Sequence, residues 1–203
     1  MNIVLQCIIL GPPLLFALTI HEYAHGYLAY QYGDPTAFNQ GRLTLNPLKH
    51  IDLLGVLCFI FLKIGWAKPV PVNDSYFKNP GRDMIWVSLA GPGANLITAV
   101  ISALLVKLFS LFSQLIPAFL LIPALQMLAA SVWINVVLAV FNLVPIPPLD
   151  GSKIVYGLLP PAFARNYSRL EPYGFIILLV LFYTGILPKL IMPIISFAQG
   201  MIV

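Results

Sequence analysis

Long apolar runs, separated by short polar loops, dominate the chain. A helix needs about 20 mainly apolar residues to cross a bilayer. The runs that qualify are residues 3–32, 83–113, 119–147 and 172–187, with a shorter candidate at 188–203. Residues 1–203 are therefore expected to form one integral-membrane domain. The predicted fold class is an all-α polytopic membrane protein with four to five transmembrane helices.

Residues 33–82 do not have the pattern of an ordinary loop. Within them, 51–66 is strongly apolar but too short and too interrupted for a span, which favours a re-entrant segment. Residues 42–46 alternate polar and apolar positions, and the proline-rich 68–73 can only be extended. Extended backbone at membrane depth is tolerated only inside protein or beside a watery cavity. We therefore expect a re-entrant region at 40–73, with short extended (β) segments that line a cavity.

The composition supports a membrane protein. Hydrophobic residues make up 60% of the chain and charged residues 9%, whereas soluble domains carry about 25% charged residues. No basic residue precedes Arg42, so the first apolar run lacks the pattern of a cleaved signal peptide and is expected to be retained. The basic residues are scattered rather than gathered in a stripe, so no nucleic-acid partner is expected. Cys7 and Cys58 lack a metal-binding spacing and are expected to be buried thiols.

The distribution of charge predicts an orientation. Loops 33–82 and 148–171 should lie on the same side, because two predicted spans separate them. They hold nine of the 11 basic residues: Arg42, Lys49, Lys63, Lys68, Lys78, Arg82, Lys153, Arg165 and Arg169. The positive-inside rule makes this side cytoplasmic and places the N-terminus outside. We expect a multi-pass protein of the cell (plasma) membrane.

The first predicted span contains the motif His21-Glu22-Tyr23-Ala24-His25. Two imidazoles at i and i+4 share one helical face and can hold one metal ion. Glu22 lies about 100° round the helix from His21, where it would reach a metal-bound water rather than the metal. Random placement of the histidines and glutamates would give this motif with a probability of about 3 in 10,000. The alternative is a pair of buried neutral histidines bonded to backbone, which leaves a glutamate in an apolar span unexplained.

Asp150 is the favoured third metal ligand, because catalytic zinc takes three protein ligands and keeps a fourth position open. It ends a stretch whose three prolines must break the third span, and a broken helix at membrane depth is typical of a functional cavity. It should also lie at the depth of the two histidines. One alternative is a solvated loop cap before Gly151. Another is that His50 or Asp52 approaches the site, although a histidine that caps local backbone is the simpler interpretation of His50.

The second span contains small residues, a proline and an amide between Ala90 and Asn95. Small residues permit close helix packing, and Pro92 should loosen the helix. Asn95 could donate to a substrate carbonyl or to its oxyanion. A pure packing role fits the sequence equally well.

Three motifs together resemble those of the site-2 protease family of intramembrane zinc metalloproteases. They are HEYAH at 21–25, GPGAN at 91–95 and NLVPIPPLDG at 142–151, in the order and spacing of the family. The resemblance implies one Zn²⁺ per chain, held by His21, His25 and Asp150, with Glu22 as the catalytic acid/base. It also implies that Asn95 and Asn142 help to position substrate.

The resemblance further implies extended, membrane-associated segments at 40–48 and 67–73 near the substrate. The expected function is hydrolysis of peptide bonds within or near transmembrane segments of membrane-protein substrates in the lipid bilayer, as in regulated intramembrane proteolysis, with the active site towards the cytoplasm. The chain resembles a minimal form without the PDZ or CBS domain that many members carry. Two rival hypotheses are a membrane metal-binding protein or transporter that uses the same ligands without proteolysis, and an inactive relative that shields transmembrane helices.

Overall fold

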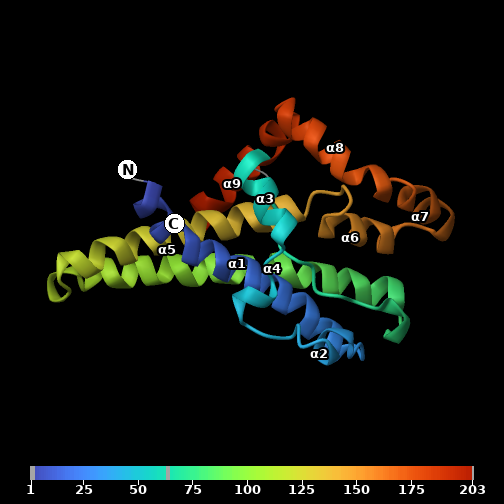
Figure 1. The fold of residues 1–203 in the computed structure, drawn as a ribbon, viewed down its shortest axis with the longest axis horizontal. Helices are drawn as coiled ribbons and strands as arrows, with labels where there is room; N and C mark the ends of the chain where they lie inside the picture. Colours follow the sequence, from blue (N-terminus) through green and yellow to red (C-terminus); the bar gives the residue numbers. More distant parts are fainter. Residues whose placement is uncertain (1–2, 63–64, 203) are drawn as a thin grey trace.

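Three long helices organise the protein. The computed structural model describes residues 3–62 and 65–202. Its long helices are α1 (Ile3–Gln31), α4 (Pro80–Leu111) and α5 (Ala118–Asn142), and each contains a stretch apolar and long enough to cross a membrane. The helices α4 and α5 lie side by side and α1 crosses them (Figure 1). The first three predicted spans therefore coincide with candidate membrane-spanning helices, to within a few residues at most ends.

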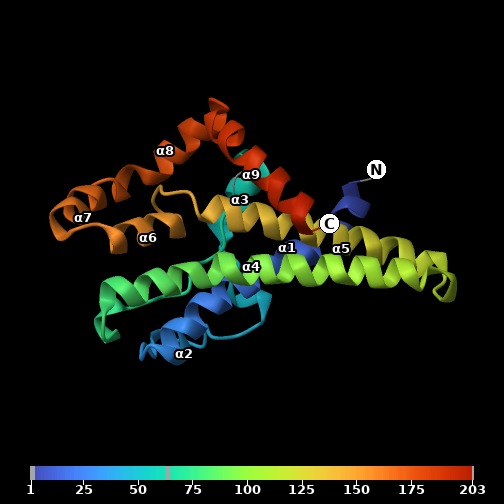
Figure 2. The ribbon, with the colours of Figure 1, turned by 180° about the vertical axis from the view of Figure 1, so that it is seen from behind.

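Shorter helices make up the rest of the described chain. They are α2 (Thr36–Asn39), α3 (Leu53–Leu62), α6 (Asp150–Leu158), α7 (Pro161–Ser168), α8 (Glu171–Tyr183) and α9 (Ile186–Ile202), with 3-10 turns at Pro47–Lys49, Asp74–Tyr76 and Ser113–Leu115. The helices α6 to α9 form an arch that starts at the end of α5 and comes back to lie against α5 nearer its middle (Figure 2). The all-helical class is confirmed for the described residues.

The ends of α4 and α5 follow from local sequence. Pro80 opens α4, where its missing N–H needs no partner. Asp83 then accepts a hydrogen bond from the backbone N–H of Asn79 at 3.0 Å, which caps the same end. At the other end of the pair, α5 stops at Asn142, five residues before the predicted end of the third span at 147. The prolines that follow cannot continue a helix, so the predicted break before Asp150 is confirmed.

The C-terminal region departs from the two predicted spans at 172–187 and 188–203. The helices α8 and α9 are separate and bent by 78°, and only the bent pair together passes as one candidate span. Gly185 adopts a φ of +74° between them, a conformation that glycine adopts without strain. The structure thus contains three candidate spans, or up to four, rather than four to five. The last predicted residue, 203, lies outside the described residues.

The predicted extended region at 40–73 is mostly not extended. Over the described residues, β pairing is limited to a single antiparallel bridge between Ile51 and Ala67. Residues 40–48 form turns and a 3-10 turn, because Gly41 takes a φ of +62° and the side chain of Asn46 caps the backbone N–H of Leu48. The period-two alternation there was wrong as a sign of a strand. Residues 68–73 lack regular secondary structure and join no sheet.

Between these segments, the apolar run forms α3, whose length of about 15 Å is half the hydrocarbon thickness. A short helix between two loops agrees with the prediction that this run does not span, and the predicted re-entrant path stays a prediction. Residues 63 and 64 lie outside the described part. The cysteine prediction was wrong, since Cys7 is exposed and Cys58 is half-buried.

Small and polar side chains occupy much of the helix interfaces, whereas large apolar ones face outwards. Ala99 of α4, Val136 of α5 and Ile195 of α9 form one buried cluster. A second cluster joins Leu149, Leu178 and Leu187 around the end of α5. Exposed leucine, isoleucine and phenylalanine side chains cover the spans, as expected when lipid rather than water is the solvent.

Candidate active site

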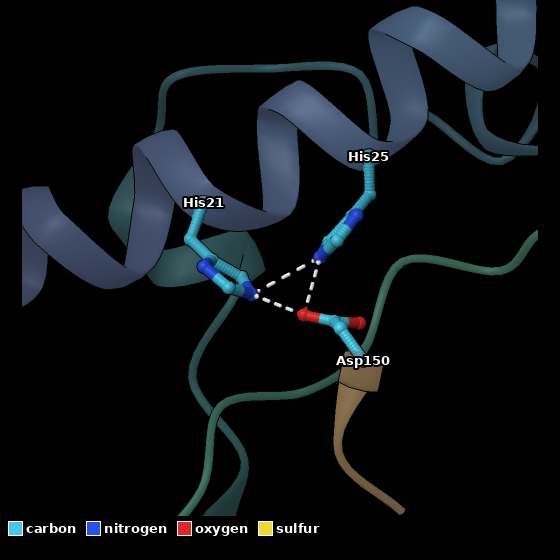
Figure 3. A group of neighbouring side chains, drawn as sticks. All are labelled: His21, His25 and Asp150. Carbon is cyan, nitrogen blue, oxygen red and sulfur yellow. Dashed lines mark hydrogen bonds and ion pairs between the residues drawn. The ribbon is translucent and has the colours of Figure 1, made fainter. Parts of the chain in front are cut away.

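Three side chains from two helices converge between the spans. His21 and His25 extend from adjacent turns of α1, and Asp150 is the first residue of α6 (Figure 3). The two Nε2 atoms lie 3.0 Å apart, and Oδ2 of Asp150 lies 3.1 Å from Nε2 of His21 and 3.2 Å from that of His25. All three residues are buried. The structure therefore brings together the three residues that the sequence suggested as metal ligands.

The ring orientations are set from α4. Nδ1 of His25 donates to the backbone carbonyl of Val87 at 2.7 Å, and Nδ1 of His21 lies 2.6 Å from Oδ1 of Asn95. Between them, Gly91 faces the rings directly: a Cβ at this position would lie 2.3 Å from Nε2 of His25 and 2.7 Å from Nε2 of His21. One face of α4, formed by Val87, Gly91 and Asn95, thus bonds both Nδ1 atoms and packs so closely against both Nε2 atoms that only glycine fits at its centre.

Asp150 reaches the histidines because the chain turns sharply after α5. A Cβ on Gly151 would lie 2.2 Å from the carbonyl oxygen of Leu143, so this turn requires glycine next to the aspartate. Burial acts to raise the pKa of the Asp150 carboxyl, but the charges and hydrogen bonds of His25 and His21 outweigh it and hold the pKa below its usual value. Asp150 is therefore ionised at neutral pH. Protonated histidines supply the positive charge in this arrangement, and a bound cation would supply it in their place and leave both imidazoles neutral.

The arrangement fits a tetrahedral zinc ion. Ligand atoms about 2.0–2.1 Å from zinc in a tetrahedron lie roughly 3.3 Å from one another, close to the 3.0–3.2 Å separations seen here. Two neutral imidazoles and one carboxylate are a usual donor set for catalytic zinc, which leaves one position open. Gly91 packs against the two Nε2 atoms, where any larger side chain would collide with the rings. These three residues could hold one zinc ion.

Glu22 is tied to the proline-rich segment 68–73. Its Oε2 accepts a hydrogen bond from the backbone N–H of Val70 at 2.8 Å. Pro69 and Pro71 have no N–H, so Val70 supplies the one backbone donor of this tripeptide. A half-buried carboxylate next to the histidine pair is placed to act as a proton acceptor.

The same segment is fixed at both ends. Lys68 donates its backbone N–H to the carbonyl of His50 at 2.8 Å and accepts from Nη2 of Arg42 at 2.8 Å. The backbone N–H of Asn73 donates to the buried carboxylate of Asp34 at 2.7 Å. The segment 68–73 is thus a strap, held by residues that follow α1.

Other candidate residues form hydrogen bonds with nearby backbone instead. Asn142 ends α5, and its amide donates to the carbonyl of Leu138 at 2.9 Å. The Nε2 of His50 donates to the carbonyl of Thr44 at 2.8 Å, as a histidine that caps local backbone does. Asp52 accepts from the backbone N–H of Gly55 at the start of α3. The group of possible metal ligands found among the described residues is His21, His25 and Asp150.

Sequence reasoning missed the supporting residues. Gly91 belongs to a motif for which packing was one interpretation. Its close approach to the two imidazoles becomes visible only when a Cβ is placed on it in the structure. The segment around Val70 was predicted to be extended, but its sequence carries no sign of a contact with Glu22. Asn135 of α5, which bonds Asn95, was not considered. An asparagine in an apolar span is itself a signal for a buried polar contact.

The fold and site define a class: a membrane-embedded metallohydrolase with an HExxH helix and a distant aspartate. Comparison with known proteins gives the same class of protein. Residues 119–184 match the model of peptidase family M50. YwhC of Bacillus subtilis (strain 168) is 42% identical over 194 residues, which are 90% of this chain and 84% of that protein.

Two mycobacterial relatives are more distant. Rip2 of Mycolicibacterium smegmatis (strain ATCC 700084 / mc(2)155) is 33% identical over 184 residues, 86% of this chain and 66% of that protein. Rip2 of Mycobacterium tuberculosis (strain ATCC 25618 / H37Rv) is 31% identical over 177 residues, 83% of this chain and 64% of that protein. All three relatives carry the name of a zinc metalloprotease. No solved structure gives a significant match.

The chain belongs to peptidase family M50, the site-2 proteases. It is an intramembrane zinc metalloprotease.

Proposed function

We propose that this protease hydrolyses peptide bonds within or near transmembrane segments of membrane-protein substrates. In this proposal His21, His25 and Asp150 hold one zinc ion and Glu22 is the catalytic acid/base. The observation that carries it is the convergence of the three buried ligand atoms to 3.0–3.2 Å, next to a glutamate on the same helix. A site built between apolar helices suits a substrate that arrives through the bilayer.

The chemistry divides between the metal and Glu22. Zinc, when bound, polarises the scissile carbonyl and lowers the pKa of a water molecule. The Glu22 carboxylate takes a proton from the attacking water and returns it to the leaving amine. The hydrogen bond from Val70 occupies Oε2 and holds the carboxylate, which leaves Oε1 to take the proton. Asp150, His21 and His25 keep their positions throughout.

The site should open towards the cytoplasm. Asn135, which lies at the level of His21 through Asn95, is about 10 Å from the C-terminal end of α5 and about 25 Å from its start. The loops at that nearer end carry most of the basic residues. The positive-inside rule then places the site near the cytoplasmic face of the plasma membrane, with the N-terminus outside.

A helical substrate must unwind before it can be cut, and the strap 68–73 offers it an unusual edge. Hydrogen-bonding groups of successive residues in extended chain point to opposite sides. The N–H groups of Lys68 and Val70 and the carbonyl of Lys68 bond within the protein. By this alternation, the carbonyls of Pro69 and Pro71 are expected to face away from it. These prolines present carbonyls without N–H groups. A substrate strand would therefore be held here by its own N–H groups donating to the two proline carbonyls.

The test uses purified protein in liposomes with a reporter that contains one transmembrane helix. We expect Glu22→Gln to retain zinc and to cut the reporter at least 100-fold more slowly, in the range attributed to general acid–base catalysis. We expect His21→Ala to lose both zinc and cleavage. Cleavage by Glu22→Gln at the wild-type rate would refute the assigned role of Glu22. Cleavage of a water-soluble peptide in preference to the reporter would refute the assigned substrate class.

A further inference from the structure

Asn95 is completely enclosed, which restricts what it can do. Its side chain is 0% exposed, and all of its polar atoms have partners within the protein. Oδ1 lies 2.6 Å from Nδ1 of His21, and Nδ2 donates to the carbonyl of Ala17 at 3.0 Å and to Oδ1 of Asn135 at 2.8 Å. No hydrogen-bonding capacity of its amide N–H groups is left for a substrate.

The direction of the Asn95 amide is determined by its neighbours. The carbonyl of Ala17 can only accept a hydrogen bond, so it must face the amide nitrogen of Asn95. Asn135 is fixed in the same way, because its Nδ2 donates to the carbonyl of Ser131 at 2.8 Å and its Oδ1 must then face Asn95. Two independent carbonyls thus turn Oδ1 of Asn95 towards His21.

This direction selects one tautomer of His21. An amide oxygen can only accept, so the short contact requires a hydrogen on Nδ1 of His21. In a neutral imidazole the other nitrogen, Nε2, then carries the lone pair. Nε2 is the atom that points to Asp150 and to Nε2 of His25. His25 is fixed similarly, but by the backbone carbonyl of Val87, which no substitution removes.

We propose that Asn95 is a positioning residue of the metal centre, which holds His21 in the tautomer and orientation that bind zinc. The inference rests on the proposed assignment of His21 as a ligand, and it replaces a substrate contact as the role of Asn95. Groups that orient metal-bound histidines in this way change metal affinity by about 10–100-fold when removed. The amide also joins α1, α4 and α5 at the level of the metal.

The experiment measures metal affinity rather than proteolysis. Zn²⁺ affinity is obtained by competition with a chromophoric chelator, and the coordination geometry from the absorption of bound Co²⁺, in purified full-length protein. Asn95→Leu, which removes the acceptor at similar volume, should bind Zn²⁺ about 10–100-fold more weakly. Asn95→Ala makes the same test if Asn95→Leu does not accumulate as folded protein.

Two variants separate orientation of His21 from general packing. Asn95→Asp keeps an acceptor for His21 but loses both Nδ2 donors, so it should lower thermal stability while Zn²⁺ affinity stays within about threefold of wild type or improves. Asn135→Ala breaks the polar network beyond Asn95 and leaves the contact with His21 intact. It should also retain Zn²⁺ affinity within about threefold.

The outcomes are distinct. Zn²⁺ affinity of Asn95→Leu and Asn95→Ala within threefold of wild type would overturn the inference. Equal weakening by Asn95→Asp or by Asn135→Ala would also overturn it, since the effect would then come from packing. If His21→Ala itself retained full affinity, the ligand assignment in the proposed function would fail. If His21→Ala lost binding while Asn95→Leu did not, only the role of Asn95 would fail.

Discussion

At the scale of single residues, the site requires a glycine at position 91. Gly91 lies so close to both imidazoles that a Cβ would approach Nε2 of His25 to 2.3 Å. The atoms that an added Cβ would meet belong to the rings of His21 and His25, which hydrogen bonds hold in place, so they cannot easily move away. We expect Gly91→Ala to displace a ring, lower Zn²⁺ affinity at least tenfold and abolish cleavage of the reporter. Overpacking of this kind also destabilises a protein by about 1–3 kcal/mol.

Gly93 provides the matched control, because it occupies the same helix and the same motif but has nothing within 4 Å of an added Cβ. Gly93→Ala should leave Zn²⁺ affinity and cleavage unchanged. Metal content by mass spectrometry and reporter cleavage are measured on both variants. Equal behaviour of the two alanine variants would contradict the view that Gly91 makes room for the ligands.

The grouping of His21, His25 and Asp150 could be predicted from the sequence, but the residues that support them could not. HExxH has a fixed helical geometry, and Asp150 follows a break that prolines make inevitable. The roles of Gly91 and Asn95 depend on how α4 is rotated against α1, and a nearly uniform apolar sequence does not encode that rotation. The resemblance suggested a substrate contact for Asn95, whereas the contacts of its amide favour His21.

At the scale of elements, the strap 68–73 is the feature closest to catalysis outside the helices. Val70→Pro would remove the N–H that bonds Glu22 while keeping the extended backbone that the neighbouring prolines already impose. We expect kcat for the reporter to fall at least tenfold with zinc content unchanged, because Glu22 loses the group that fixes it. Val70→Ala retains the N–H and should keep most of the activity.

The opposite pattern would disprove this role of the strap. If Val70→Ala lost as much activity as Val70→Pro, the side-chain contact of Val70 with α1 near Gly26 would matter instead. A parallel loss of zinc in Val70→Pro would indicate damage to the ligands rather than to Glu22. Zinc content and kcat are therefore measured on the same preparations.

Sequence patterns predicted long helices much better than the segments between them. The apolar runs of α1, α4 and α5 are stable in a bilayer only as helices, since every backbone N–H and C=O group must be bonded within the protein. Polar and apolar residues alternate at 42–46, but this segment can also form turns. The side-chain cap of Asn46 and the turn at Gly41 form there instead of a strand. Strands also need a partner edge, which a periodic pattern cannot guarantee.

At the scale of the whole molecule, charge and structure make one prediction about orientation. Ser75 lies in the basic loop between α3 and α4, and Gln114 lies in the turn between α4 and α5. Both are exposed. In a chain without Cys7 and Cys58, a membrane-impermeant maleimide added to intact cells should label Gln114→Cys but not Ser75→Cys. Inverted vesicles should give the reverse pattern, and labelling of Ser75→Cys from outside would contradict the cytoplasmic site.

The bent pair α8–α9 raises the remaining question of topology, and packing suggests an answer. Leu187, near the start of α9, contacts the cluster around Leu149 beyond the end of α5. Ile195, two turns later, contacts Ala99 and Val136 at the level just past the metal site. In the proposed orientation, α9 would run from the cytoplasmic end of the bundle into the membrane, and α8, bent by 78° from it, could not also lie along the bilayer normal.

We accordingly expect α9, rather than residues 172–187, to be the segment that enters the bilayer after α5. Ile195 packs about 9 Å from the C-terminal end of α5, so Gly200, five residues later, lies about 16 Å from that end, near the middle of the bundle. Gly200 is exposed, with space for a larger side chain, and Gly200→Cys should therefore be protected from the membrane-impermeant maleimide both in intact cells and in inverted vesicles. Labelling of Gly200→Cys from outside, as for Gln114→Cys, would instead make α9 a complete fourth span. Labelling from the cytoplasmic side alone would make the pair α8–α9 a re-entrant loop.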